Sequence, residues 1–292
     1  GQFMPPYVKS MVPAPGLTVA PNTGIIVEFN SAMSTASINS ANIKLFNITG
    51  GASAEVVSGV TISLDSNEQR FVTISHSDLS AGTYEARVLG GAAGASGMSM
   101  RPPANASDIA FKSSFIVSGS NDSAAPTIYP SMASGATGLA VNKPLTFGFN
   151  ETLSFSTVNN TNITLYKGAT AVAADVKYDP GANSVSIVPN NALSPNTVYI
   201  VIFSAAVKDL ASNSLATSSY SYTTGGVDVI APTLKEVRCD DYTCKIFFTE
   251  PINHQTLVDS NWISSTLNHA RIVITQGGPD KATAAASITY DS

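Results

Sequence analysis

Several oxygen-bearing side chains stand where they could bind a metal ion. Glu151 and Asp209 each follow an apolar segment, Asn213 lies shortly after Asp209, and Asp122 stands in a Gly- and Ser-rich stretch. Carboxylate and amide oxygens are the hard ligands that Ca²⁺ prefers. No Asp-x-Asp-x-Asp run accompanies them, so the alternative is a set of solvated acids on polar loops. Calcium is the chemistry that these residue types favour.

The residues that usually carry catalysis form no such group. His76, His254 and His269 lie in unrelated segments, and none has a serine or cysteine nucleophile at a recognisable spacing. The glycine-rich run at 90–94 does not open a helix, as a nucleotide-binding loop would. No motif points to a pair of glycosidase carboxylates. The sequence therefore predicts a protein that is not an enzyme.

The two cysteines, Cys239 and Cys244, enclose four polar residues and are flanked by apolar ones. This pattern predicts two strands joined by a tight turn. Cysteines bordering such a turn can lie opposite each other, within reach of a disulfide, and a disulfide indicates an oxidising compartment. Two reduced thiols are the alternative. A metal site is not favoured, because no second cysteine pair or histidine cluster supplies further ligands. We predict a disulfide.

The segments that must position these residues come in copies. Residues 27–46 align with 147–166 at a shift of 120 positions. A third copy, shifted by 99 from the second, aligns Glu250 with Glu151 and Trp262 with Ile163. A period near 100 residues suits a chain of separate small domains. We expect domains at 1–120 and 121–226 and a partial domain at 227–292.

The third copy ends before its last strands, which would leave sheet edges open. A cut chain, a later segment or strands from a neighbouring molecule would each account for this. We expect a truncation. Likewise, the start at Gly1 is expected to be that of a mature or excised segment.

Each copy contains six or seven short strand-like segments bounded by Gly, Pro, Asn or Ser, several of them alternating, such as Val185 to Val188. This pattern predicts an all-β fold of tandem antiparallel β-sandwiches, the third incomplete. Helix is expected only as short turns near 34–40 and 154–160.

In such a sandwich, the loop after the second strand and the loop between the last two strands return to the pole where the chain enters. Glu151 belongs to the first loop, Asp209 and Asn213 to the second, and Asp122 to the entering linker. We therefore expect these residues to converge at the joint between the first two copies. Ca²⁺ bound there would stiffen an otherwise flexible spacer.

The second joint is expected to repeat the arrangement. Asp228 stands in the linker to the third copy, and Glu250 occupies the position of Glu151. A third ligand for that joint would come from the absent part of the third copy.

The composition excludes several classes of protein. Hydrophobic residues make up 43% and charged residues only 12% of the 292, with a formal net charge of -5. This charge offers no basic face for nucleic acid. No apolar run approaches the ~20 residues of a membrane span. Charged residues are about half as frequent as usual, a composition typical of secreted β-proteins and surface-layer proteins.

The second copy resembles a known family. The matching segments are 125–127, the strand end Phe149-Asn150-Glu151, Asn162 to Leu165, 193–199, 207–213 and 220–224. They resemble the bacterial Ig-like domain of the surface-layer type. The resemblance implies seven-stranded Ig-like sandwiches from an extracellular or cell-surface protein, without catalytic activity.

Together these observations predict a structural module: a surface-layer or filament subunit, or a spacer rod. Its partners would be copies of itself in a lattice or filament, or other cell-surface components. The alternatives are an adhesin stalk that binds a glycan or host protein and an accessory region of a secreted hydrolase.

Overall fold

The computed structural model describes residues 4–100, 105–226, 233–239 and 244–249. In this part of the chain the structure is built from strands, with two three-residue 3-10 helices, η1 (Thr49–Gly51) and η2 (Phe155–Thr157). The first copy forms β1 (Val8–Val12), β2 (Thr18–Val19), β3 (Ile25–Phe29), β4 (Ile43–Asn47), β5 (Ala54–Val56), β6 (Thr61–Leu64), β7 (Phe71–Ser75), β8 (Gly82–Leu89) and β9 (Ile109–Val117). The second forms β10 (Ile128–Pro130), β11 (Ala136–Leu139), β12 (Leu145–Phe149), β13 (Ile163–Lys167), β14 (Thr170–Val172), β15 (Ala174–Asp179), β16 (Ser184–Pro189), β17 (Val198–Phe203) and β18 (Ser218–Thr224).

The two copies have the same topology. The first pairs a four-stranded sheet, β1-β3-β7-β6, with a five-stranded sheet, β2-β9-β8-β4-β5. The second repeats both orders as β10-β12-β16-β15 and β11-β18-β17-β13-β14. Pairing is antiparallel except for β2 with β9 and β11 with β18, which run parallel. The expectation of an all-β chain of tandem Ig-like sandwiches is confirmed.

Alternation of apolar and small residues creates each core. On β12, Leu145, Phe147 and Phe149 point inward and are buried, while the residues between them point outward. Phe147 lies against Phe203 of the opposite sheet, with ring centroids 4.9 Å apart in an edge-to-face arrangement. Aromatic contacts of this kind add to the free energy gained by burying the rings. Each sandwich therefore has its own core, as the period-two pattern predicts.

An asparagine directly follows β3 in the first copy and β12 in the second. The Oδ1 atom of Asn150 accepts a hydrogen bond from the backbone N–H of Thr127 at 2.6 Å. At the equivalent position in the first copy, Asn30 Oδ1 accepts one from Tyr7 N–H at 2.8 Å. Each asparagine ties the strand end to the incoming chain, which explains why the Phe-Asn pair occurs in both copies.

The sandwiches touch through an apolar contact on the outer face of the first one. Phe71 of β7 and Ile26 of β3 point away from their own core and are buried to 2% and 1% exposure. Phe71 stacks on Phe155 of the second sandwich, with ring centroids 3.9 Å apart. We call this contact the joint. Ile26 and Phe71 thus form an apolar patch on the outer face of this sheet, beside the charged Glu28.

Backbone and ionic contacts extend the joint. Gly24 donates its N–H to the carbonyl of Leu210 at 2.8 Å. A Cβ on Gly24 would lie 3.2 Å from that carbonyl oxygen, so a larger residue would fit only if the backbone of the Leu210 loop shifted by a few tenths of an ångström. Lys177 of the second sandwich lies 3.4 Å from Glu68 of the first. The linker thus connects two bodies that also contact each other directly.

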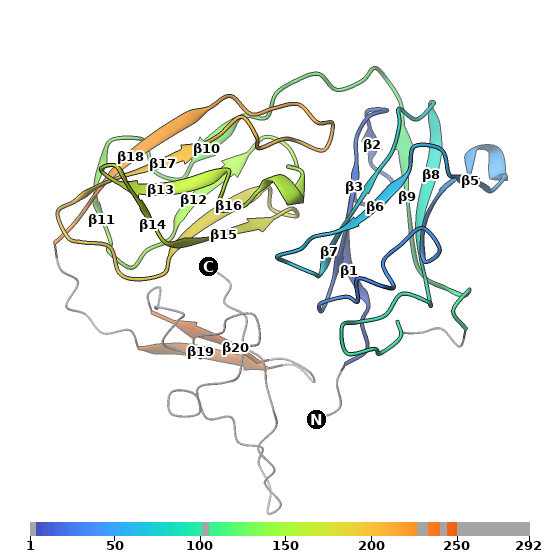
Figure 1. Ribbon diagram of the computed structural model, residues 1–292, viewed down its shortest axis with the longest axis horizontal. Coiled ribbons are helices and arrows are strands. Elements are labelled where there is room, and N and C mark those ends of the chain that lie inside the picture. The colour runs from blue at the N-terminus through green and yellow to red at the C-terminus, as the bar shows by residue number, and fades with distance from the viewer. Residues whose placement is uncertain (1–3, 101–104, 227–232, 240–243, 250–292) are drawn as a thin grey trace, which may run out of the picture.

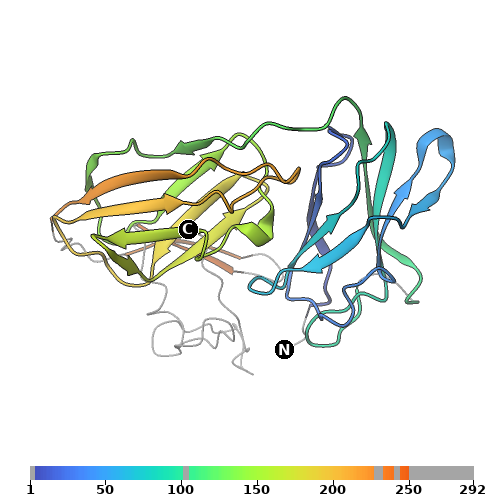
Figure 2. The ribbon, with the colours of Figure 1, turned by 45° about the horizontal axis from the view of Figure 1, so that its top comes forward.

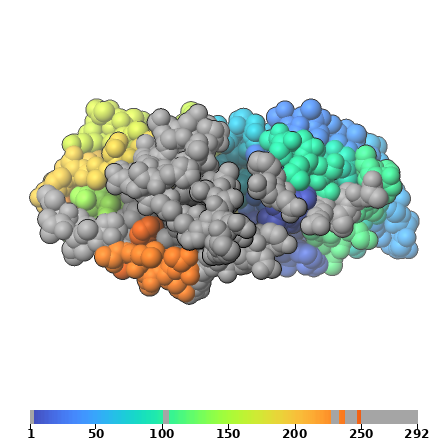
Figure 3. All heavy atoms as spheres, turned by 90° about the horizontal axis from the view of Figure 1, so that it is seen from below, coloured from blue at the N-terminus to red at the C-terminus, as the bar shows by residue number. Residues whose placement is uncertain are grey.

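The joint sets an angle between the sandwiches. β3 and β9 of the first run up the page in Figure 1, whereas β13 and β17 of the second run across it. Seen from below, the two sandwiches lie at opposite ends of the long axis (Figure 3). The strands of the two sandwiches therefore run in different directions, and the spacer rod expected from the sequence would contain a bend at this joint. The reason is physical: the apolar outer face around Phe71 is buried only if the second sandwich lies against it.

After the second sandwich, β19 (Leu234–Cys239) and β20 (Cys244–Phe248) form an antiparallel pair. The two strands predicted around the cysteines are therefore present. Most of the partial third domain expected at 227–292 lies outside the described residues, so this domain and its incompleteness stay a prediction.

No helix within the described residues has the length and apolar character that crossing a bilayer requires.

The joint can be tested with a pair of neighbouring substitutions. Phe71→Ser introduces the residue found at the equivalent position, Ser184, and should weaken the coupling between sandwiches by about 2–4 kcal/mol, as for other large-to-small changes at buried sites. Small-angle X-ray scattering should then show a larger maximum dimension.

Val72→Ala is the control, because Val72 points into the core of the first sandwich. This change should lower the melting temperature of that sandwich without changing the scattering profile. An unchanged maximum dimension in Phe71→Ser would contradict the joint as the source of the angle.

Candidate functional site

Three carboxylates meet at the joint. Asp122 lies on the linker, Glu151 on the loop after β12, and Asp209 on the loop between β17 and β18. One ligand oxygen from each lies within 4.8 Å of the others. Oxygens bound to one Ca²⁺ at 2.3–2.6 Å are at most about 5 Å apart, so this spacing is compatible with a shared ion.

Asp209 is held by its own loop. Its side chain is 2% exposed. Oδ1 accepts hydrogen bonds from the backbone N–H groups of Ala211 and Asn213, both at 2.8 Å. Oδ2 accepts one from the side-chain amide of Asn213 at 2.8 Å. Ser212 adopts a left-handed backbone with φ of 72°, which turns the loop back toward Asp209. The carboxylate is therefore fixed in place before any ligand arrives.

Asp122 is held between the two sandwiches. Asn22 of the first sandwich accepts a hydrogen bond from Asp122 N–H at 2.8 Å and donates one to its carbonyl at 2.9 Å. Asn213 of the second donates to the same carbonyl at 3.3 Å. Any ligand that binds Asp122 together with Glu151 and Asp209 would thus connect the linker to the second sandwich. It would do so at the residue of the linker that Asn22 of the first sandwich already holds by hydrogen bonds.

The cluster is electrostatically unfavourable when it carries three negative charges. The pKa of Glu151 is raised from 4.5 to about 7, chiefly because burial disfavours its charged form and further because Asp209 and Asp122 repel it. None of the ion pairs among the described residues involves these three carboxylates. A proton or a cation would relieve the repulsion. An all-oxygen set of this kind suits a hard cation such as Ca²⁺.

The other predicted site residues differ in what can be said of them. Asn213 is part of the cluster, where its amide nitrogen orients Asp209 and the Asp122 carbonyl. Asp228 and Glu250 lie outside the described residues, so the second joint stays a prediction. Cys239 and Cys244 are directly opposite each other in the register of β19 and β20. Their side chains lie outside the described set, and the disulfide stays a prediction.

Two further features of the sequence point to residues of the site and of the joint. Asn22 has a counterpart, Asn142, at the same 120-residue shift, which marks it as a repeated position. Ile25-Ile26-Val27 is an unbroken apolar run where the second copy alternates. A strand that is apolar on both faces is typical of one covered from both sides. That run indicated a covering partner for the first sandwich.

His76, the histidine within the described residues, lies among backbone carbonyl groups. The ring nitrogens of His76 lie 2.8 Å from the carbonyl oxygen of Thr23 and 3.0 Å from that of Ser77. Both neighbours are carbonyl acceptors, so the tautomer decides which of them receives the ring N–H. His254 and His269 lie outside the described residues.

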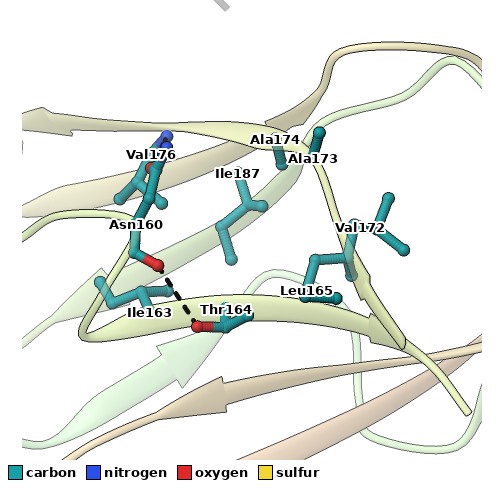
Figure 4. A pocket seen from close by; sticks show the side chains of 10 residues that line it. Asn160, Ile163, Thr164, Leu165, Val172, Ala173, Ala174, Val176 and Ile187 are labelled. Carbon is teal, nitrogen blue, oxygen red and sulfur yellow. Dashed lines mark hydrogen bonds between the residues drawn. The ribbon is translucent and has the colours of Figure 1, made fainter. Parts of the chain in front are cut away.

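An apolar pocket of about 330 Å³ opens at one edge of the second sandwich. It lies where the chain crosses from β14 to β15 (Figure 4). Its lining consists of Asn160, Ile163, Thr164, Leu165, Ala171, Val172, Ala173, Ala174, Val176 and Ile187. The side chain of Asn160 is held by the pocket wall, because its Oδ1 accepts a hydrogen bond from the backbone N–H of Val176 at 3.1 Å. None of the lining side chains is ionisable, so the pocket offers no acid, base or nucleophile.

The chain belongs to the bacterial Ig-like domain family, whose sequence profile matches residues 4–115 and 122–224. Ig-like domains of this family are typically non-catalytic modules of extracellular or surface proteins. No curated protein matches the chain by sequence.

The solved structures that the chain matches share little sequence with it. CopC from Methylosinus trichosporium OB3b is 19% identical, covering 38% of this chain and 92% of its own, with a TM-score of 0.29. PcoC, a methionine rich copper resistance protein from Escherichia coli, is 18% identical, covering 39% and 98%, with a TM-score of 0.31. A chimeric titin Z1Z2 is 13% identical, covering 77% and 97%, with a TM-score of 0.31. Likeness at this level supports no conclusion about function.

The carboxylate cluster predicts an unusual dependence of stability on pH. The pKa of Glu151 is higher in the folded state than its ordinary value of 4.5. The folded state therefore binds the proton more tightly, and stability falls as pH rises from about 4.5 to about 7. In EDTA, Glu151→Gln should remove this fall, so its advantage in melting temperature over the parent chain should grow across the same window.

Glu55→Gln is the control, because Glu55 lies on the first sandwich and pairs with Lys44 away from the cluster. It should show no such growth. A difference between Glu151→Gln and the parent that stays constant from pH 4.5 to pH 7 would contradict the repulsion.

Proposed function

We propose that the chain is a non-catalytic structural module of an extracellular or cell-surface protein, serving as a subunit of a surface layer or filament. The observation that supports this best is the joint. Tandem sandwiches that contact each other through buried aromatic rings, a backbone hydrogen bond and an ion pair hold a defined angle. A component of an ordered array needs such a defined shape, because each copy must present its contacts in the same direction.

The composition supports the same proposal. Charged residues make up 12% of the chain, and small polar residues fill the surface between the apolar positions. Surfaces of this kind can pack against one another without removing many charges from water. A module that binds copies of itself, or other cell-surface components, benefits from this property.

Calcium would act at the joint. Bound by Asp122, Glu151 and Asp209, it would neutralise their mutual repulsion and connect the linker to the loops of the second sandwich. The remaining positions of its coordination sphere, which holds six to eight oxygens, would be filled by backbone carbonyls or water. The ion would contribute rigidity, and no chemical step depends on it.

The calcium proposal predicts opposite effects of one substitution under two conditions. Ca²⁺ at about 100 times its dissociation constant should stabilise the parent chain by about 2.7 kcal/mol and raise its melting temperature by several degrees. Glu151→Gln should be more stable than the parent in EDTA at pH 7.5 because it lacks the repulsion, yet gain little from Ca²⁺.

Glu55→Gln should respond to Ca²⁺ as the parent does, and Asp209→Ala should lose the response together with some stability. If Ca²⁺ shifts neither the parent nor the control, the calcium proposal fails, while the structural role of the module remains open to its own test.

The structural role is tested on the native cell surface. Electron microscopy of cells that make the protein, with antibody labelling of the first sandwich, should show label on a regular lattice or filament. Label found only on isolated, irregularly placed molecules would reject the array, and binding of labelled protein to host glycans would then favour an adhesin stalk.

A further inference from the structure

The outer faces of the two five-stranded sheets occupy equivalent positions but differ in chemistry. In the first sandwich, β8 presents Glu85 and Arg87 on this face, joined to each other at 2.5 Å. Lys112 on β9 lies 3.7 Å from Glu85, and Lys44 on β4 lies 2.7 Å from Glu55 on β5. Arg87 also lies over the ring of Phe46, 3.8 Å from its centroid. This face is covered with ion pairs, as a solvated sheet face commonly is.

The second sandwich replaces these charges with aliphatic and hydroxyl side chains. On β17, Val198, Ile200 and Ile202 alternate with the buried Tyr199, Val201 and Phe203. Val198 is 53% exposed and Ile202 is 36% exposed. The same topology and register place Ile200 and Ile202 where the first sandwich has Glu85 and Arg87.

Hydroxyl side chains border this aliphatic row on both sides. Across the ladder from it lie Thr164 and Tyr166 on β13 and Ser219, Ser221 and Thr223 on β18. The outer edges carry Ala171 on β14 and Thr137 on β11. We call these ten residues the neutral face; they are Thr137, Thr164, Tyr166, Ala171, Val198, Ile200, Ile202, Ser219, Ser221 and Thr223. None carries a charge at neutral pH. Figure 2 shows β18, β17 and β13 side by side in this sheet.

We propose that the neutral face is the surface through which one copy of this chain binds a second copy, sheet against sheet, about a two-fold axis. This rests on the proposed structural function and assigns it a contact surface. The absence of charged side chains from this face favours a partner surface that is also uncharged. The chain carries a net charge of -5, so two copies repel each other least when they meet through a surface that brings no further like charges together.

A two-fold axis also matches the chemistry of the face to itself. It brings the aliphatic row of one copy onto the aliphatic row of the other, and hydroxyls onto hydroxyls, each of which can donate and accept. Aligned packing of two sheets about 10 Å apart is a common arrangement for such faces. A partner with charged side chains would leave them without counter-charges on this face.

The size of the face predicts a weak pairing. The five strands are 3 to 7 residues long and average five residues. At about 4.8 Å between strands and about 3.3 Å per residue they cover roughly 400 Å², so two copies would bury about 800 Å² in total. This area is smaller than that of a stable specific interface and is typical of weak, transient contacts. Contacts of this strength associate reversibly in solution and become effective when many act together in an array.

The test transfers the charge pair of the first sandwich onto the second. Ile200→Glu with Ile202→Arg copies Glu85 and Arg87 at positions that carry them in the same fold, and it leaves the net charge unchanged. Sedimentation velocity of the full chain between about 10 and 500 µM should show the parent shifting toward a dimer, as expected for a weak interface. The double variant should stay monomeric, with an unchanged circular dichroism spectrum.

Val57→Thr is the matched control, because Val57 is 71% exposed but lies outside the neutral face. It should dimerise as the parent does. A parent chain that stays monomeric at 500 µM, or a double variant that dimerises equally, would overturn the proposal.

Failure of this proposal can be told apart from failure of the proposed function. If labelled arrays form on cells with both the parent and the double variant, the neutral face is not the contact while the structural role stands. If the parent dimerises in solution and no array is seen, the face is a contact but the role in an array is rejected.

Discussion

The stacking of Phe71 on Phe155 is the contact on which the arrangement of the molecule depends. Within a β-sandwich, an aromatic ring on the outer face of a sheet would normally be left in water. Here it is covered by the next domain, and the gain from removing it from water holds the two bodies together. Without this contact the linker alone would set the distance between the sandwiches and leave their angle free.

The same contact brings unfavourable charges together. Once the pole of the second sandwich lies against the first, Asp122 is fixed by Asn22 and cannot move away from Glu151 and Asp209. Apolar burial thus supports an electrostatic arrangement that would not persist on a flexible linker. The stability of the joint and the affinity of the carboxylates for a proton or cation are therefore coupled through one geometry.

Local patterns in the sequence were sufficient to predict the strands and their repetition. Alternation along β12 and β17 and the repeated Phe-Asn pairs report on neighbours within one sandwich. The meeting of Asp122, Glu151 and Asp209 was also predictable, because loops at one pole of a sandwich must lie together once the topology is known. The engagement of Asn213 as a donor could not be foreseen, since it depends on the turn at Ser212.

The sequence pattern did not predict the angle between the sandwiches, for a different reason. The angle depends on which outer sheet face carries apolar side chains. Single positions decide this: Ile26 and Phe71 are apolar, whereas their counterparts Thr146 and Ser184 are polar. The repeat consists of the positions that the two copies share, and these positions form the cores. The surfaces that distinguish the copies depend on positions that are not repeated, so the repeat does not predict them.

The residues of the second sandwich that are equivalent to Ile26 and Phe71 also limit how a further domain could be attached. Thr146 and Ser184 place hydroxyl groups where the first sandwich has Ile26 and Phe71. A domain that follows the second sandwich would therefore find no aromatic ring at the position that Phe71 occupies in the joint. In a longer protein built from these repeats, the corner between the first two sandwiches would therefore not be reproduced at the next junction by the same stacked pair of rings.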